Sequence, residues 1–396
     1  MVPRLLASIV LTSPVACRPA APPQPPPPAS PAPVTAITPA EADPEPREPD
    51  DLGPLLAPIV ERMQVPGLGA AVVDREGVVA LGVAGLRRVD RPEPLRIDDR
   101  FHLGSDTKAM TAFVVGRLVD AGALAWDDPL ETLLPDSAMH AAYRAVTVDA
   151  LLTHRGGLPA NAEWLALEAM LDPEDTAPQQ RAAVARFALR QAPHHAPGGA
   201  FLYSNLGYIV LGAALQAHTG EPWEALMQRE VFEPLQMRSC GFGPVSTADA
   251  PDGSWAHDRE GIEYQPVELD NPAYLGPAGT VHCTLPDWGR FAQAMFDDGP
   301  GLSAATREHL RTPIEGDDAY ARGWLVSDAF PLGETIITHD GSNTVNYASI
   351  VIAPRRGLAL MTACNAGDAA AQGAAVDAML TVMKRYGRPA AKGPAR

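Results

Sequence analysis

The chain has 396 residues, of which 46% are hydrophobic, and a formal net charge of −17 at pH 7. This composition supports a large buried core, in one large domain or two smaller ones. The acidic surface would repel phosphate backbones, which excludes nucleic acid as an expected partner and gives anionic substrates no long-range attraction.

The first residues predict an export signal. Arg4 supplies a positive end, a short apolar run covers 5–11, and small residues precede Cys17. The apolar run is too short to remain as a membrane-spanning helix. Because small residues before a cysteine resemble a bacterial lipoprotein cleavage site, residues 1–17 are predicted to be a lipoprotein-type signal peptide with Cys17 as the lipidated residue. Plain secretion, with cleavage near the same point, is the alternative.

Residues 18–50 are predicted to form a proline-rich, disordered linker. At about 3 Å per residue, an extended linker of this length would reach roughly 100 Å. Such a spacer suits a domain that is tethered to a membrane surface and held away from it. The folded domain is then predicted to cover residues 51–390.

The domain is predicted to begin with a helix and a β-hairpin. Apolar residues recur at helical spacing over 55–63 and end at a Pro-Gly pair. Two apolar runs at 69–73 and 78–83, joined by a polar turn, predict the hairpin. Residues 106–121 are apolar on nearly every side, which predicts a central buried helix, and 145–240 are predicted to be mostly helical.

Four strand-like runs follow towards the C-terminus, at 323–326, 335–338, 347–352 and 358–363, before a last helix at 368–385. Strands at both ends of the chain with helices between them predict an α+β fold. We expect one mostly antiparallel sheet, built from N- and C-terminal strands and flanked by helices, with a mostly helical subdomain inserted.

Cysteine usage predicts no particular disulfide and no metal site. The four cysteines are Cys17, Cys240, Cys283 and Cys364, and no pair has metal-ligand spacing. If Cys17 is modified or removed, at most one disulfide can form among the other three. HExxH, CxxC and P-loop motifs are absent from the sequence, so no metal or cofactor is expected.

The strongest signal for chemistry is the pair Ser105 and Lys108, at the start of the predicted buried helix. Residues three apart share one helix face, so the two side chains project together. The helix N-terminus adds free N–H groups and partial positive charge, which favour an alkoxide and a later oxyanion. A neutral lysine, its pKa lowered by burial, can act as the base for a serine nucleophile. The alternative is a capping serine beside a solvated lysine.

The scarcity of lysine strengthens this interpretation. The chain has three lysines, and the other two, Lys384 and Lys392, lie near the C-terminus. The remaining basic residues are arginines, which cannot lose their proton in proteins. Of lysine and arginine, only lysine can become neutral in a protein. Lys108 is therefore the one basic residue, lysine or arginine, in the interior of the sequence that could act as a base.

Two further motifs supply candidate partners. Tyr203 and Asn205 precede a predicted apolar helix; a phenol near a lysine can relay a proton, and an amide can contact an ester or amide substrate. Alone, this motif could equally be a buried tyrosine with a capping asparagine. His339, Asp340, Gly341 and Ser342 end a predicted strand, whose edge could offer the Ser342 backbone N–H as a second oxyanion donor. His154-Arg155-Gly156 is a second His-x-Gly motif. The predicted strand at 335–338 leads directly into His339, which favours His339 over His154 as the site residue.

Ser-x-x-Lys, Tyr-x-Asn and His-x-Gly, in this order, resemble the penicillin-recognising serine hydrolases. That superfamily includes class C β-lactamases, D-alanyl-D-alanine carboxypeptidases and family VIII esterases. The resemblance covers about 52–385, and VPGLGAAVV at 65–73, LLTHRGGLP at 151–159 and PGGAFLYSNLGYIVLG at 197–212 support it. The sequence lacks a Gly-x-Ser-x-Gly elbow, which disfavours an α/β-hydrolase.

The resemblance implies a role for each motif. It makes Ser105 the acylated serine and Lys108 with Tyr203 the proton-transfer pair. It places Asn205 near the substrate amide, and the N–H groups of Ser105 and Ser342 at the oxyanion hole. These implied roles describe hydrolysis through a covalent acyl-enzyme.

Two positions depart from the β-lactamase pattern. Class C β-lactamases carry lysine where this chain has His339. Histidine here resembles the peptidase and esterase branches, and lysine holds its positive charge more reliably at pH 7. Many relatives carry threonine or serine in place of Asp340, and that hydroxyl helps hold a substrate carboxylate. If Asp340 faces the site, its charge opposes such a carboxylate, which predicts a preference for neutral acyl groups in esters or amides.

The sequence as a whole predicts a serine hydrolase for ester or amide bonds, with β-lactams as one candidate, acting on a small-molecule or peptide substrate. One alternative is a D-alanyl-D-alanine carboxypeptidase or amidase for cell-wall peptides; another is a catalytically inactive binding module on the same fold. The expected location is the bacterial cell envelope, tethered through the lipidated N-terminus, or the secreted fraction. The oligomeric state is not predicted.

Overall fold

The computed structural model describes residues 47–163, 167, 170–314 and 319–387. The predicted signal peptide with Cys17, most of the predicted linker and the last three residues of the predicted domain lie outside the described residues. No helix in the described ranges is both long enough and apolar enough to cross a membrane.

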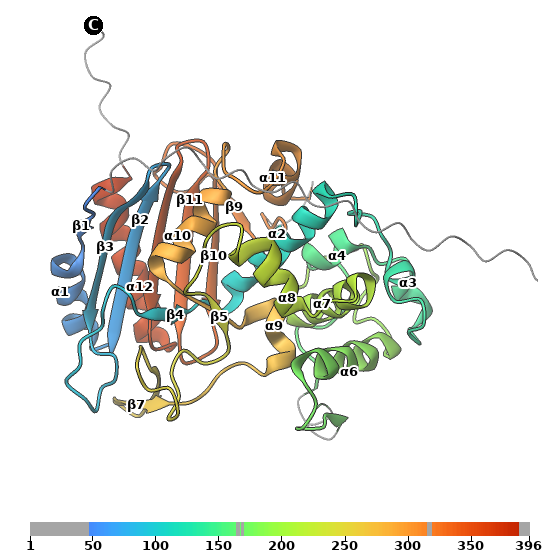
Figure 1. Cartoon of the computed structure of the whole chain (residues 1–396), viewed down its shortest axis with the longest axis horizontal. Helices are drawn as coiled ribbons and strands as arrows, with labels where there is room; N and C mark the ends of the chain where they lie inside the picture. Colours follow the sequence, from blue (N-terminus) through green and yellow to red (C-terminus); the bar gives the residue numbers. More distant parts are fainter. Residues whose placement is uncertain (1–46, 164–166, 168–169, 315–318, 388–396) are drawn as a thin grey trace, which may run out of the picture. The chain divides into compact units, whose positions relative to one another are not determined.

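A seven-stranded sheet joins the two ends of the described chain (Figure 1). Its strand order is β1-β3-β2-β12-β11-β10-β9, and all neighbours pair antiparallel except β1 and β3. The strands are β1 (Asp50–Asp51), β2 (Gly67–Asp74), β3 (Gly77–Gly85), β9 (Leu325–Ser327), β10 (Ile336–Ser342), β11 (Tyr347–Ala353) and β12 (Leu358–Cys364). Together with the helices described next, this sheet confirms the predicted α+β fold.

Helices cover both faces of the sheet. Strand residues alternate between the faces, and Leu68, Ala70 and Val72 of β2 pack with α1 (Gly53–Met63) and α12 (Ala369–Tyr386). Ala71 and Val73 belong to the larger apolar core on the other face, together with α10 (Leu285–Ala294) and the helical part of the chain. The central strands are buried on both faces, as their continuous apolar runs predict.

The inserted helices gather on one side of the sheet (Figure 1). Helix α2 (Thr107–Asp120) is buried from Thr107 to Leu118, as the sequence predicts. The other helices are α3 (Leu130–Leu133), α4 (Val148–Leu152), α6 (Ala177–Arg190), α7 (Asn205–Thr219), α8 (Trp223–Met227), α9 (Gly276–Gly279) and α11 (Ala304–Arg311). Short helical turns are η1 (Gly104–Asp106), η2 (Ala141–Tyr143), η3 (Gln228–Phe232) and η4 (Ala273–Leu275).

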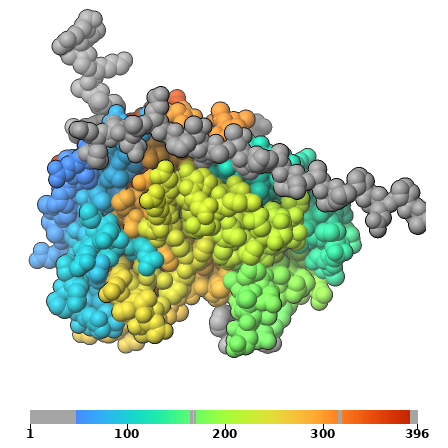
Figure 2. Space-filling view, viewed as in Figure 1, coloured from blue at the N-terminus to red at the C-terminus, as the bar shows by residue number. Residues whose placement is uncertain are grey.

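Two small sheets lie beside the main one. Strands β4 (Arg100–His102), β8 (Val281–Thr284) and β5 (Gly241–Phe242) form the first, and β6 (Ala256–Glu260) pairs with β7 (Glu263–Val267) in the second. Figure 2 shows the segment before β4 next to the β6–β7 region, in cyan and yellow. The Trp255 N–H donates to the Arg87 carbonyl across this boundary, at 2.9 Å.

A disulfide joins Cys240 to Cys283, which lie 43 positions apart, so the structure fixes a pairing that the sequence left open. Cys283 lies in β8, and Cys240 directly precedes β5. Cys364 is a free, buried thiol. The disulfide ties the end of the helical part to a strand of the core.

Replacing both Cys240 and Cys283 with serine is expected to lower the free energy of unfolding by about 2–4 kcal/mol, because the unfolded chain regains the freedom that the crosslink removes. Urea unfolding without reductant measures the difference. Reduced wild-type protein is the control, and its unfolding midpoint is expected to equal that of the double variant. Equal unfolding midpoints for the variant and the oxidised wild type would contradict the prediction.

Candidate active site

Ser105 and Lys108 lie at the N-terminal end of α2, as their spacing predicts. Gly104, with φ of +51°, begins the turn η1 that carries Ser105, and Lys108 is in the first turn of the helix. The Lys108 Nζ lies 3.0 Å from Ser105 Oγ. Ser105 is partly exposed, so the hydroxyl beside the amine is within reach of a ligand.

The Lys108 amine has three polar neighbours. Besides Ser105, it donates to Asn205 Oδ1 at 2.7 Å and to the Ala278 carbonyl at 2.8 Å. A neutral amine has two hydrogens and one lone pair. Asn205 Oδ1 and the Ala278 carbonyl oxygen can only accept, so they take both hydrogens of a neutral amine. The lone pair of that amine is then free to accept the Ser105 hydroxyl proton. The geometry therefore matches a lysine acting as a base.

The surroundings of Lys108 favour its neutral form. The side chain is fully buried, and no carboxylate in the described part of the chain lies within ion-pair distance. Burial lowers the pKa of Lys108 well below its usual range, while Asp106 opposes this. Burial, helped by the charge of Asp340, raises the pKa of Asp106 well above its usual value. Burial thus disfavours the charged forms of both Asp106 and Lys108.

Tyr203 and Asn205 meet this pair from the start of α7. The Ser204 hydroxyl accepts the Gly207 N–H at 2.9 Å, an N-cap that fixes where the helix begins. The Tyr203 ring centroid lies 4.8 Å from Lys108 Nζ, and its hydroxyl hydrogen-bonds with Ser105. Burial raises the pKa of Tyr203, so the phenol keeps its proton at neutral pH.

His339 faces the same space from β10. Its Nδ1 lies 2.8 Å from the Asp340 carbonyl, which can only accept, so this nitrogen carries the hydrogen. Its Nε2 lies 3.3 Å from the Tyr320 hydroxyl and accepts from it. Burial is the main cause that lowers the pKa of His339, to about 3. The imidazole is therefore neutral at physiological pH.

Asp340 does not join the others. Neighbouring strand residues point to opposite faces, and Asp340 shares its face with Tyr347, whose hydroxyl it hydrogen-bonds. The side chain is exposed. The sequence predicts that Asp340 repels a substrate carboxylate if its side chain faces the site. In the structure the Asp340 side chain lies on the other face of the sheet, so the charge of Asp340 acts only from that face.

Gly341 and Ser342 lie against the segment that carries Ser105. A Cβ atom on Gly341 would overlap the Leu103 carbonyl, and one on Gly104 would overlap the Ser342 nitrogen, so both positions require glycine. Strand β9 pairs with β10 only over Ile336–Thr338, so residues 339–342 form a free edge on that side. The backbone N–H of Ser342 is thus close to the backbone of Ser105.

The structure adds His154 to the site, a residue that the sequence alone does not place there. The His154 ring lies 4.4 Å from that of Tyr203 and 4.7 Å from that of Tyr320, between centroids. Its Nδ1 accepts the Ser204 N–H at 3.0 Å, which holds the segment after Tyr203. The signal was present as the second His-x-Gly motif, but nothing in the sequence places it beside Tyr203.

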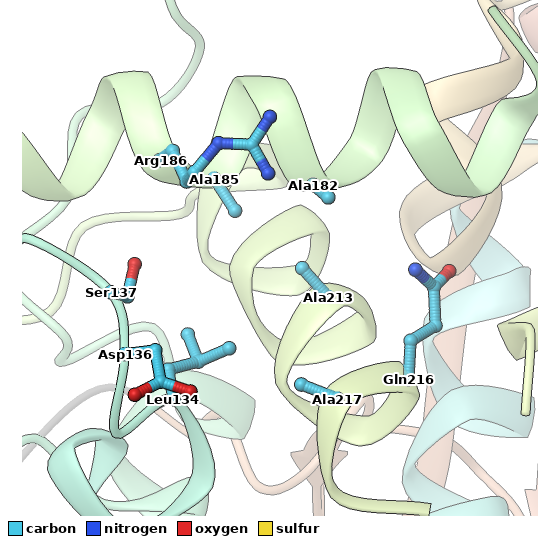
Figure 3. A pocket seen from close by; sticks show the side chains of 9 residues that line it. All are labelled: Leu134, Asp136, Ser137, Ala182, Ala185, Arg186, Ala213, Gln216 and Ala217. Carbon is cyan, nitrogen blue, oxygen red and sulfur yellow. The ribbon is translucent and has the colours of Figure 1, made fainter. Parts of the chain in front are cut away.

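A groove elsewhere in the helical part contains none of the predicted site residues. It encloses about 400 Å³ between α6, α7 and the loop after α3 (Figure 3). Four alanines and a leucine provide its apolar lining, with Asp136, Ser137, Arg186 and Gln216 at the sides. The site at the start of α2 is thus separate from this groove.

The chain is similar to proteins with hydrolytic names. It is 26% identical over 336 residues to "Unguisins hydrolase ungD'" of Aspergillus campestris, covering 80% of this chain and 61% of that relative, so it spans about three fifths of that protein's length. It is 25% identical over 305 residues to "Beta-lactamase" of Escherichia coli, covering 74% of each chain.

A solved structure shares the fold. The D-amino acid amidase from Ochrobactrum anthropi SV3, complexed with L-phenylalanine amide, matches with a TM-score of 0.66 and 22% identity, over 83% of this chain and 97% of that one. A family model described as Beta-lactamase matches residues 52–381, nearly the whole described domain. The chain therefore belongs to the beta-lactamase family of serine hydrolases and penicillin-binding proteins.

Proposed function

We propose that this protein hydrolyses esters or amides through an acyl-enzyme formed on Ser105, with Lys108 as the base. The observation that carries the proposal is the arrangement of the buried Lys108 amine, whose Nζ lies 3.0 Å from Ser105 Oγ while Asn205 Oδ1 and the Ala278 carbonyl can accept its hydrogens. A serine hydroxyl is a weak nucleophile until such a base removes its proton.

In the proposed acylation step, Ser105 Oγ bonds to the substrate carbonyl carbon while its proton passes to Lys108 Nζ. The Tyr203 phenol gives its proton to the leaving group as the bond between that group and the carbonyl carbon breaks, and Lys108 passes the proton taken from Ser105 on to Tyr203. Water then cleaves the ester to Ser105. The backbone N–H groups of Ser105 and Ser342 are the proposed donors to the oxyanion.

β-Lactams and the C-terminal ends of peptides carry a carboxylate that enzymes of this family bind. The proposed substrates of this protein lack a carboxylate at that position. His339 occupies the place of a lysine in class C β-lactamases, and burial keeps its imidazole neutral, with a pKa of about 3. Lys108, which also lies in this site, is needed in neutral form.

The neutral imidazole of His339 disfavours the first alternative, a D-alanyl-D-alanine carboxypeptidase or amidase. A D-alanyl-D-alanine carboxypeptidase must recognise the terminal carboxylate of a peptide, and a neutral His339 offers hydrogen bonding without charge. The second alternative, an inactive binding module, leaves the desolvated Lys108 unexplained, since burying an amine costs free energy that a scaffold has no need to spend.

A substrate panel tests the proposed preference. Purified protein is expected to hydrolyse p-nitrophenyl acetate and amino acid amides with kcat/KM at least about tenfold above that for nitrocefin and for D-alanyl-D-alanine peptides, because about 1.4 kcal/mol of unfavourable carboxylate desolvation corresponds to a factor of ten. Efficient nitrocefin hydrolysis without any hydrolysis of short-chain esters would contradict the preference.

We also propose export, with a lipid tether at Cys17 and a spacer over residues 18–50. The supporting observation is the Cys240–Cys283 disulfide, because disulfides persist in the periplasm and outside the cell rather than in a reducing cytosol. Metabolic labelling with a palmitate analogue tests the tether: wild-type protein is expected to incorporate it, and a Cys17→Ser variant is not.

A further inference from the structure

Behind the proposed site, one carboxylate holds several chain segments together. Asp270 lies in the loop between β7 and η4, and 7% of its side chain is exposed. Its Oδ1 lies 2.8 Å from His102 Nε2 and accepts from Asn343 Nδ2 at 2.9 Å. The backbone N–H of Asn271 donates to the same oxygen at 2.6 Å. These partners belong to three segments that are distant in the sequence.

The first segment leads to Ser105. His102 is fully buried at the end of β4, and the Gly104 N–H donates to its Nδ1 at 3.1 Å. Because Nδ1 accepts, the hydrogen of a neutral imidazole is on Nε2, the nitrogen that lies 2.8 Å from Asp270 Oδ1. The carboxylate thereby orients the ring that holds Gly104, and Gly104 in its left-handed conformation sets the position of the Ser105 backbone.

The second and third segments lead to the other side of the site. Asn343 directly follows Ser342, and the buried Asn346 amide donates to Asn343 Oδ1 at 3.1 Å. Asn271 donates through its side chain to the Gly279 carbonyl at 2.7 Å, next to the Ala278 carbonyl that receives Lys108. One oxygen of Asp270 is therefore linked to the backbone around Ser105, Ser342 and the Lys108 acceptor.

The charge state of Asp270 suits this position. Burial alone would raise its pKa, but the hydrogen bonds from His102, Asn343 and the Asn271 backbone outweigh burial and lower it. Bonds from neutral donors to a charged acceptor are stronger than bonds between neutral groups. A single carboxylate thus accepts from Asn343 and the Asn271 backbone and lies 2.8 Å from His102 Nε2.

We propose that Asp270, acting through His102 and Asn343, is a positioning residue that sets the separation of the two oxyanion donors, the N–H groups of Ser105 and Ser342. These donors stabilise charge that develops in the transition state, so a shift of either one lowers the rate more than it weakens binding. The inference rests on the proposed function, since it assumes that Ser105 is acylated.

The test uses Asp270→Ala, Asp270→Asn and wild-type protein with a fluorophosphonate probe, which reacts with the serine whatever the natural substrate is. The limiting labelling rate of the alanine variant is expected to fall by about 10–100-fold per folded molecule, with the half-saturating probe concentration within about threefold of wild type. The asparagine variant keeps an acceptor oxygen, and its limiting labelling rate is expected to lie between those of wild type and Asp270→Ala. Wild-type labelling is the separate test of the proposed function.

The matched control is Asp120→Ala, at the opposite end of α2. Asp120 accepts from Ser303 N, Ser303 Oγ and Thr306 Oγ1, so its loss removes a comparable set of bonds that does not reach the site. We expect it to lower thermal stability and leave the labelling rate unchanged. Should Asp270→Ala fail to fold, Asn343→Ala keeps the carboxylate and its contact with His102, removes the Asn343 bonds to Asp270 and from Asn346, and is expected to slow labelling. The proposal is overturned if these variants at 270 and 343 label at wild-type rates, if the loss lies in probe binding, or if Asp120→Ala shows an equal loss.

Discussion

Ser105→Ala is expected to lower kcat for p-nitrophenyl acetate by about 10⁴-fold or more and to abolish fluorophosphonate labelling. The reason is chemical: the hydroxyl oxygen forms the covalent intermediate, and alanine leaves only the background contributed by binding and oxyanion stabilisation. Ser105 is partly exposed and its side chain is small, so the protein should fold normally. Mass spectrometry of the labelled wild type should place the adduct on the peptide that contains Ser105.

The control for this prediction is Ser342→Ala. The Ser342 hydroxyl donates to the Asn346 carbonyl and accepts the Thr344 N–H, whereas the proposed contribution of Ser342 to catalysis is its backbone N–H, which alanine retains. This variant is expected to label at a rate within about tenfold of wild type. If Ser105→Ala labels as strongly as wild type, the nucleophile is a different residue.

Lys108→Arg is expected to lower kcat/KM by about 10²–10⁴-fold, although it conserves positive charge. Arginine cannot supply a lone pair, because its pKa lies above 12, and a larger guanidinium would have to fit between Asn205 and the Ala278 carbonyl. Circular dichroism and the thermal midpoint separate this chemical loss from misfolding. Retention of most activity in a folded Lys108→Arg variant would exclude Lys108 as the base.

The pH profile of the wild type follows from the same residue. A lysine acts as a base only when neutral, so kcat/KM is expected to fall as the pH drops through the pKa of Lys108, which burial places well below its usual value. His339, with a pKa of about 3, should not contribute between pH 5 and 9. A profile that keeps falling from pH 10 to pH 7 would show that Lys108 has an ordinary pKa.

Local patterns explain how much the sequence could predict. Helical spacing brings Ser105 and Lys108 to one face, and the apolar surface of 106–121 predicts that this helix is buried, as α2 is. The resemblance to the penicillin-recognising hydrolases is confirmed by the family match, and the fold that it implies is confirmed by the structure. Alternation along a strand could also have separated Asp340 from His339, because adjacent strand residues face opposite ways.

Long-range packing explains what the sequence could not predict. Asp270 is one aspartate among many until the fold brings it to His102 and Asn343. The pairing of Cys240 with Cys283 depends on where β8 runs, and three cysteines leave several choices. His154 required a left-handed backbone with φ of 58° to reach Tyr203, which no local signal indicated.

The closure of the sheet by both ends of the chain has a consequence for folding order. Leu68 pairs with Cys364, and the Tyr386 hydroxyl donates to Asp50 across 336 positions. Contacts this distant in sequence form late, because loop closure must be completed before they contribute. Ser105 and Lys108 can meet within one nascent helix, but His339 and Ser342 join them only when the last strands have been synthesised. The site therefore cannot form on the growing polypeptide before β10 has been synthesised. A chain that stops before β10 would lack His339 and Ser342, and we expect it to have no activity.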